Sequence, residues 1–191
     1  MDDDNDIQLI YQAISYKLTR EAVTLPNGVA THWSVVRHKG AACVLPIDGD
    51  DLILVRNYRP HLGLWILELP GGGIEGDEPP LNAARRELRE EAGYTAAHLA
   101  PLGSYRQVQG FSDFKLHWFC ATGLCQVGQY LDTHEVCEPI RRPFIDVVAM
   151  LRRGELEDSQ IPTGLMLALL HGALPPAQRA ALLDALSYAE T

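Results

Sequence analysis

The stretch GGIEGDEPPLNAARRELREEAGY, residues 72–94, decides the fold of this chain. Residues 82–92 within it lack glycine and proline, and most of them are alanine, leucine, arginine or glutamate, which favour the α-helix. Pro79 and Pro80 precede this run, where a first helical turn tolerates proline, and Gly93 follows it, where glycine favours a helix end. The sequence therefore predicts one short helix over residues 82–92.

Three glutamates of this helix are expected to share one face. Glu87, Glu90 and Glu91 are three and four positions apart, which is the spacing that brings side chains together on an α-helix. Like charges at this spacing repel by roughly 0.2 to 0.5 kcal/mol per pair, and a divalent cation would remove that cost. Arg86 lies four positions before Glu90 and can pair with it. The face is a candidate magnesium site, and a solvated charged helix is the alternative interpretation.

A glycine run comes shortly before the predicted helix. Residues 70–73 read Pro-Gly-Gly-Gly, and glycine lets backbone N–H and C=O groups approach an anion or a metal closely. We therefore expect the glycine run and the acidic helix to form one cradle for a diphosphate and its metal.

The whole stretch resembles the signature of the Nudix hydrolases, Gly-x5-Glu-x7-Arg-Glu-U-x-Glu-Glu-x-Gly-U with U apolar. Every fixed position is occupied, by Gly72, Glu78, Arg86, Glu87, Leu88, Glu90, Glu91, Gly93 and Tyr94. The resemblance implies that Glu87, Glu90 and Glu91 hold Mg²⁺, for which Mn²⁺ is a substitute. It also implies that Arg86 and Glu78 orient these carboxylates.

Residues upstream resemble one subgroup of that family, the ADP-ribose and nucleoside-diphosphate-sugar pyrophosphatases. The matching segments are Arg-Asn-Tyr-Arg-Pro at residues 56–60 and Leu-Glu-Leu-Pro-Gly-Gly at residues 67–72. The resemblance implies that Arg59 and Gly72 contact substrate, that Glu68 lies beside the pocket, and that the carbonyl of Gly71 joins the metal ligands. A surface ion pair is the alternative for Arg59, and a plain strand carboxylate is the alternative for Glu68.

A second acidic segment, residues 132–141, corresponds to a loop that ends in a glutamate before a strand in the subgroup. Glu138 matches that glutamate best, and Glu135 is the second candidate. A loop carboxylate of this kind can take the proton of an attacking water or hold another magnesium. The alternative for both residues is a carboxylate exposed to solvent.

The chain departs from the subgroup at two positions. Gln109 stands where proline is expected, and Phe114 stands where a glutamate is expected. Asp113 is a candidate to replace the missing acid. Phe111 and Phe114 are candidates to stack on a base or sugar, with core packing as the alternative.

Composition narrows the class of partner and the compartment. The chain has 191 residues, 47% of them hydrophobic, which suits one domain with a substantial core. Its 16 basic and 25 acidic residues give a net charge of −9, which argues against nucleic-acid or anionic-membrane binding. Four scattered cysteines show no zinc pattern, and the apolar run at residues 165–170 is too short to span a bilayer. We expect a cytoplasmic protein.

The rest of the chain predicts an α/β (α+β) fold, a Nudix-type mixed β-sheet sandwiched between helices, with an N-terminal β-hairpin element. Turn residues 26–28 join hairpin strands at 21–25 and 30–37. Other strands are expected at 41–47, 52–58, 65–69, 99–108 and 116–121, and other helices at 144–153, 162–173 and 176–189. We expect an N-terminal β element over 1–39 and a hydrolase domain over 40–191, and the resemblance implies a homodimer formed through the first.

The expected reaction is Mg²⁺-dependent hydrolysis of the diphosphate bond in ADP-ribose or a nucleotide sugar. Its products would be a nucleoside monophosphate and a sugar phosphate. A dinucleoside polyphosphate or a nucleotide triphosphate is the alternative substrate. A nucleotide-sensing module without turnover is the alternative function.

Overall fold

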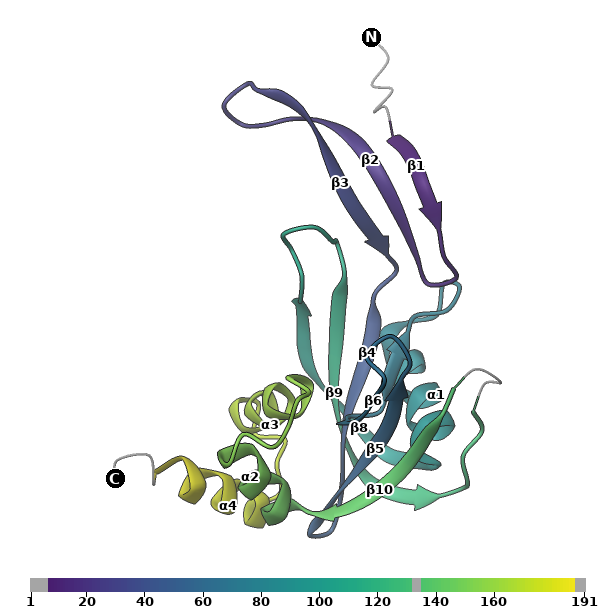
Figure 1. Cartoon of the computed structure of the whole chain (residues 1–191). Coiled ribbons are helices and arrows are strands. Elements are labelled where there is room, and N and C mark those ends of the chain that lie inside the picture. The colour runs from purple at the N-terminus through teal and green to yellow at the C-terminus, as the bar shows by residue number, and fades with distance from the viewer. Residues whose placement is uncertain (1–6, 132–134, 188–191) are drawn as a thin grey trace.

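The computed structural model describes residues 7–131 and 135–187. They form two sheets and a set of helices (Figure 1). The strands are β1 (Ile7–Gln12), β2 (Tyr16–Thr24), β3 (Ala30–His38), β4 (Ala41–Asp48), β5 (Asp51–Arg59), β6 (Leu64–Glu68), β7 (Gly71–Gly73), β8 (Tyr94–Arg106), β9 (Lys115–Gln126) and β10 (Cys137–Pro143). The helices are α1 (Pro80–Ala92), α2 (Phe144–Arg152), α3 (Gln160–Leu170) and α4 (Pro176–Ser187).

The first sheet is antiparallel, in the order β1-β2-β3, and it projects from the rest of the molecule (Figure 1). Its β2–β3 hairpin matches the expected one, but β2 covers 16–24 rather than 21–25 and β3 covers 30–38 rather than 30–37. Strand β1 was not predicted. All of its residues are exposed, and its sequence, IQLIYQ, lacks the regular alternation of apolar and polar residues that indicates a strand with one buried face.

The second sheet runs in the order β10-β5-β4-β9-β8, with β6 paired to β5 and β7 paired to β4. Strands β4 and β9 are parallel, whereas the other pairs are antiparallel. Helix α1 covers one face, and α2, α3 and α4 lie on the other (Figure 1). The predicted mixed sheet between helices is therefore confirmed.

Strand β4 shows how the two faces are filled. Ala42 and Val44 pack in one apolar cluster with Leu88 of α1, while Cys43 and Leu45 pack in the other cluster with the C-terminal helices. Because helices cover both faces, the strand is apolar almost throughout instead of alternating. The packing of α1 on β4 therefore fixes the position of the acidic face relative to the sheet.

Element boundaries differ from the sequence predictions in several places. Helix α1 begins at Pro80, two residues earlier than expected, and α3 covers 160–170 rather than 162–173. Strand β8 covers 94–106 rather than 99–108. Strand β9 covers 115–126 rather than 116–121. The last two residues predicted for the final helix, 188–189, lie outside the described residues.

The cysteine and membrane expectations can be compared with the fold. All four cysteines are free thiols, and three of them are buried. Across 7–131 and 135–187, the structure has no helix with the length and apolar character needed to cross a bilayer.

Candidate active site

The glycine run is a short strand rather than a loop, and it lies against α1. Strand β7 pairs with Ala42 and its neighbours in β4, so closely that a Cβ on Gly71 would be 2.5 Å from the carbonyl oxygen of Ala42. A Cβ on Gly72 would overlap the carboxylate of Glu87. Glycine at both positions therefore lets the acidic face of α1 approach the sheet.

Arg86 organises the acidic face. Its Nη1 donates to Glu87 Oε1 at 2.8 Å and to Glu90 Oε2 at 3.0 Å. Its Nη2 donates to the carbonyl oxygen of Gly73 at 2.8 Å and to Glu78 Oε1 at 2.8 Å. One guanidinium thus fixes three signature carboxylates and ties them to β7, as the fork of an arginine allows.

Glu91 is held in a different way. Its Oε2 accepts a hydrogen bond from the backbone N–H of Gly71 at 2.7 Å. Glu91 and Glu87 are only 5% and 6% exposed, so both carboxylates are buried in the wall of the site. Gly71 therefore contacts the acidic cluster through its backbone N–H. The atom predicted to bind the metal is its carbonyl oxygen, which lies on β7.

Burial changes the acidity of these two groups. Desolvation raises the pKa of Glu87 to about 7, although Arg86 opposes the shift. Desolvation also raises the pKa of Glu91 to about 8, and the nearby charges of Glu87 and Glu135 add to it. Both carboxylates therefore keep a proton to higher pH than an exposed glutamate does, and a bound cation would favour their ionised form.

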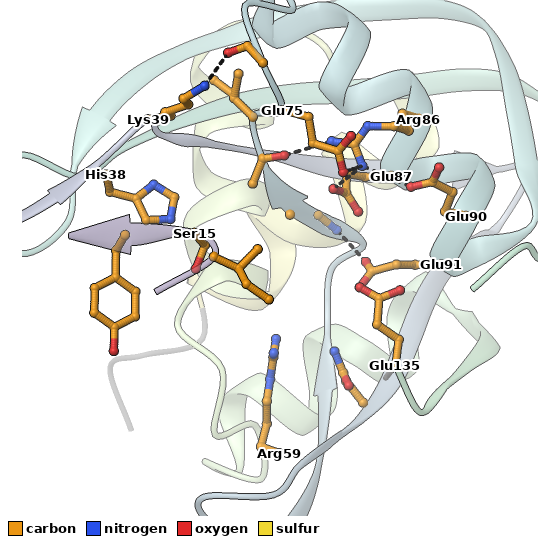
Figure 2. Close-up of a pocket in the computed structure, with 18 of the residues that line it drawn as sticks. Ser15, His38, Lys39, Arg59, Glu75, Arg86, Glu87, Glu90, Glu91 and Glu135 are labelled. Atoms are coloured by element: carbon orange, nitrogen blue, oxygen red, sulfur yellow. Dashed lines mark hydrogen bonds and ion pairs between the residues drawn. The ribbon is translucent and has the colours of Figure 1, made fainter. Parts of the chain in front are cut away.

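A cavity of about 1000 Å³ opens beside the acidic face. Figure 2 shows Glu87, Glu90, Glu91 and Glu135 on one side of it and Arg59 on another. Other lining residues come from the β1–β2 turn and the end of β3, and they include Ser15, Lys17, Arg37, His38 and Lys39. The cavity therefore has an acidic wall and a basic wall.

The structure brings most of the predicted site residues to this cavity. Those that line it are Arg59, Gly71, Gly72, Arg86, Glu87, Glu90 and Glu91. Glu68 does not line it, but its carboxylate accepts a hydrogen bond from Arg59 Nε at 2.8 Å and forms an ion pair with Arg59 Nη2. Glu68 therefore holds the cationic side chain that faces the cavity.

The two candidate loop carboxylates have different positions. Glu138 lies on β10, is 55% exposed at its side chain, and pairs with Arg56 Nη1 at 3.6 Å, outside the cavity. Glu135 lines the cavity, and Figure 2 shows it beside Glu91. Strand β10 starts at Cys137, so Glu138 already belongs to the sheet and pairs across to β5.

The residues that depart from the subgroup are also placed. Asp113 lines the cavity and accepts hydrogen bonds from the backbone N–H of His38 at 2.9 Å and from Arg37 Nη1 at 3.1 Å. Phe114 packs against the core and meets the ring of His38 edge-on at 4.8 Å, whereas Phe111 is exposed. The core interpretation therefore holds for Phe114.

The basic wall was not found from the sequence. Its basic residues, Lys17 and those at 37–39, come from the N-terminal sheet and its exit, and no motif connects them with the signature. Lys39 donates to the carbonyl oxygen of Gly76 at 2.9 Å, which ties this wall to the turn before α1. Only the pairing of chain segments in space brings the two walls together.

The donor set of the acidic face suits a hard divalent cation. It offers several carboxylate oxygens, those of Glu87 and Glu91 in a buried setting, and carboxylate oxygens are ligands that Mg²⁺ prefers. Within the described part of the chain, no three His, Cys, Asp or Glu side chains already converge closely enough to hold a metal. Glu87 and Glu90 instead point to Arg86, so metal binding requires these side chains to rotate.

Comparison with known proteins identifies the family of this chain. The family model described as the NUDIX domain matches residues 36–156, which is more than half of the chain. The chain belongs to the NUDIX domain family. This match confirms the predicted Nudix hydrolase.

Relatives of this Nudix protein cover most of its length. An ADP-ribose pyrophosphatase of Bacillus subtilis is 34% identical over 157 residues, which cover 81% of this chain and 85% of that protein. A methanol dehydrogenase activator of Bacillus methanolicus is 31% identical over 168 residues, which cover 86% and 91%. A solved structure of an ADP compounds hydrolase shares the fold, with a TM-score of 0.73, 22% identity, and coverage of 91% of this chain and 94% of that one.

Proposed function

We propose that this Nudix protein hydrolyses the diphosphate bond of ADP-ribose or a nucleotide sugar with the help of Mg²⁺, for which Mn²⁺ can substitute. The products are a nucleoside monophosphate and a sugar phosphate. The observation that carries the proposal is the cavity of about 1000 Å³ with the signature carboxylates on one wall and basic side chains on another. The name of the Bacillus subtilis relative, an ADP-ribose pyrophosphatase, supports the choice of substrate.

The residues of the acidic wall would hold the metal. Glu87, Glu90 and Glu91, with the carbonyl of Gly71, are the proposed ligands, and Arg86 and Glu78 orient them. A bound divalent cation supplies charge neutralisation for the diphosphate and a lower pKa for water. Gly71 fixes Glu91 by its N–H, so this carboxylate is already aimed before substrate arrives.

Other residues bind substrate and move a proton. Arg59 presents its guanidinium to a phosphate oxygen, and Glu68 keeps that guanidinium in place. Gly72 lines the cavity and offers its backbone to the diphosphate, and its lack of a side chain lets the Glu87 carboxylate lie beside it. Glu135, which lines the cavity, accepts the proton of the attacking water.

The test is a substrate panel with purified protein and magnesium chloride. It contains ADP-ribose, nucleotide sugars, dinucleoside polyphosphates and nucleotide triphosphates, and the released monophosphate is measured by chromatography. We expect the fastest turnover with ADP-ribose or a nucleotide sugar. Preferred cleavage of a polyphosphate or triphosphate would change the substrate assignment, and no cleavage of any member would favour a nucleotide-sensing role.

We also propose that the protein is a homodimer that associates through the N-terminal sheet. Strand β1 and the turn after it expose large apolar side chains, which are Ile7, Leu9, Ile10, Tyr11 and Ile14. A patch of this kind on a projecting sheet is typical of a protein interface. Light scattering after size-exclusion chromatography should give twice the mass of one 21.1 kDa chain, and Leu9→Lys with Tyr11→Lys should give the single mass.

A further inference from the structure

The carboxyl end of α1 is held by the chain that follows β9. The N–H groups of Val127 and Gly128 donate to the carbonyl oxygen of Gly93 at 2.8 and 3.1 Å, and the N–H of Tyr130 donates to that of Glu90 at 3.1 Å. The last carbonyls of an α-helix have no partner inside the helix. Donors from this segment therefore satisfy acceptors that α1 leaves open.

Gly93 allows this close approach. Its φ of 75° lies in the left-handed region that favours glycine. A Cβ at this position would be 2.9 Å from the backbone nitrogen of Gln129 and 3.0 Å from the carbonyl carbon of Gly128. The signature glycine that ends α1 thus also makes room for the segment that docks on it.

The side chain of Gln129 joins α1 to the start of β10. Its amide nitrogen donates to the carbonyl oxygen of Glu91 at 2.5 Å and to that of Cys137 at 3.1 Å. A primary amide has two N–H donors, so one group can serve both acceptors. The Sγ of Cys137 also lies 3.9 Å from the same carbonyl of Glu91.

These attachments flank Glu135 in the sequence. Tyr130 is bonded to α1 on one side of it, and Cys137 is bonded through Gln129 on the other. Glu135 lines the cavity that Glu87 and Glu91 also line (Figure 2). The chain is therefore held on both sides of Glu135 at the end of the helix that carries those glutamates.

We propose that Gln129 is a positioning residue, which fixes the flanks of Glu135 against α1 and so sets the place of that carboxylate in the cavity. The inference rests on the proposed role of Glu135 in hydrolysis. Gln129 has no contact with the cavity and is not among its lining residues. Its effect on turnover must therefore pass through the segment that it holds.

The decisive experiment is a double-mutant cycle on turnover of ADP-ribose with magnesium. Gln129→Met keeps a similar length and removes both donors. We expect it to lower kcat about tenfold with little change in KM, because a misplaced catalytic group costs rate rather than binding. In the Glu135→Gln background the same change should cost almost nothing further. Full additivity of the two effects would show a general structural role and overturn the inference.

A second measurement needs neither metal nor substrate. Hydrogen exchange of the free protein should become faster at the N–H of Tyr130 in Gln129→Met, while the amides in the middle of α1 stay unchanged. Thr95→Ala is the matched control, since it removes a hydroxyl that donates to the carbonyl of Cys125 at 3.4 Å in the neighbouring strands. It should leave both turnover and exchange at Tyr130 as in the wild type.

The outcomes separate this inference from the proposed function. Normal turnover in Gln129→Met beside strong loss in Glu135→Gln would overturn the positioning role and leave the hydrolase assignment intact. Unchanged exchange at Tyr130 in Gln129→Met would overturn it as well. A wild-type protein that cleaves no member of the substrate panel would refute the proposed function, and the positioning role with it.

Discussion

Glu21 of the N-terminal sheet and Glu91 of helix α1 are both buried, but the pKa values of their carboxylates shift in opposite directions. Glu21 on β2 is 8% exposed and accepts hydrogen bonds from the guanidinium of Arg37 and from the hydroxyl of Thr19, at 2.7 Å for the latter. These partners lower its pKa. Glu91 on α1 is 5% exposed, and burial raises its pKa to about 8.

The two buried carboxylates differ in whether a cationic side chain contacts them. Among the described residues, the carboxylate of Glu91 accepts a hydrogen bond from the N–H of Gly71 alone, whereas Glu21 has a cation in contact. A buried charge with a matched partner stabilises structure, while one without a partner costs free energy unless a ligand neutralises it. Glu21 is therefore stabilised by a cationic partner, whereas Glu91 has no hydrogen bond from a cation among the described residues and is proposed as a metal ligand.

The largest expected effect is at Glu91. Glu91→Gln should lower turnover about a hundredfold or more, because it removes a proposed metal ligand. The same change should raise the thermal stability of the metal-free protein, because burial of Glu91 costs free energy that grows as the pH rises from its ordinary pKa of 4.5 to the folded-state value of about 8. Activity assays measure the loss of turnover, and thermal unfolding without metal measures the gain in stability. Wild-type turnover in this variant would show that Glu91 is not needed as a metal ligand.

A second prediction concerns the fit of β7 against α1. Gly72→Ala should lower turnover about tenfold, because the added Cβ would displace the carboxylate of Glu87. Gly73→Ala is the matched control, since a Cβ there meets no atom within 4 Å. Equal activities in the two variants would show that the place of Glu87 does not matter for turnover.

The third prediction tests the balanced carboxylate in the other region. The pKa of Glu21 is lower in the folded protein than its ordinary value of 4.5, so its contribution to stability is complete above that pH. It is lost as the pH falls through the folded-state pKa. Glu21→Gln should therefore cost about 1 kcal/mol at pH 7 and progressively less in acid. Urea unfolding of both proteins at a series of pH values measures this, and a pH-independent difference would contradict it.

The smallest effect is expected at Glu138. Its carboxylate is exposed and pairs with Arg56 at the surface, so Glu138→Gln should change turnover less than about twofold. Glu135→Gln should lower turnover about a hundredfold if Glu135 takes the proton. Steady-state kinetics of both variants decide between the two carboxylates, and a large loss at Glu138 alone would reverse the assignment.

Some of the site could be predicted because its geometry is local. The spacing of Glu87, Glu90 and Glu91 places them on one helix face whatever the rest of the chain does. Arg86 pairs with Glu90 at the expected interval of four residues, and it also reaches Glu78. Helix α1 begins only two residues before its predicted start.

Other parts could not be predicted because they depend on contacts distant in sequence. Gln12 and residues 14–17 and 37–39 line the cavity from the side of a separate sheet. The resemblance favoured Glu138 over Glu135 as the catalytic loop carboxylate. Pairing of β10 with β5 places Glu138 in the sheet, opposite Arg56. Strand register therefore places Glu138 outside the cavity that Glu135 lines.

Spacing within about two dozen residues was enough to predict a helix with an acidic face, the glycines before it and the family. The tertiary structure alone decided that the glycines form β7, that a basic wall faces the acidic one, and that Gln129 bridges α1 and β10. The physical reason is that hydrogen bonding and packing between distant segments place these groups, and a linear pattern does not encode their distances.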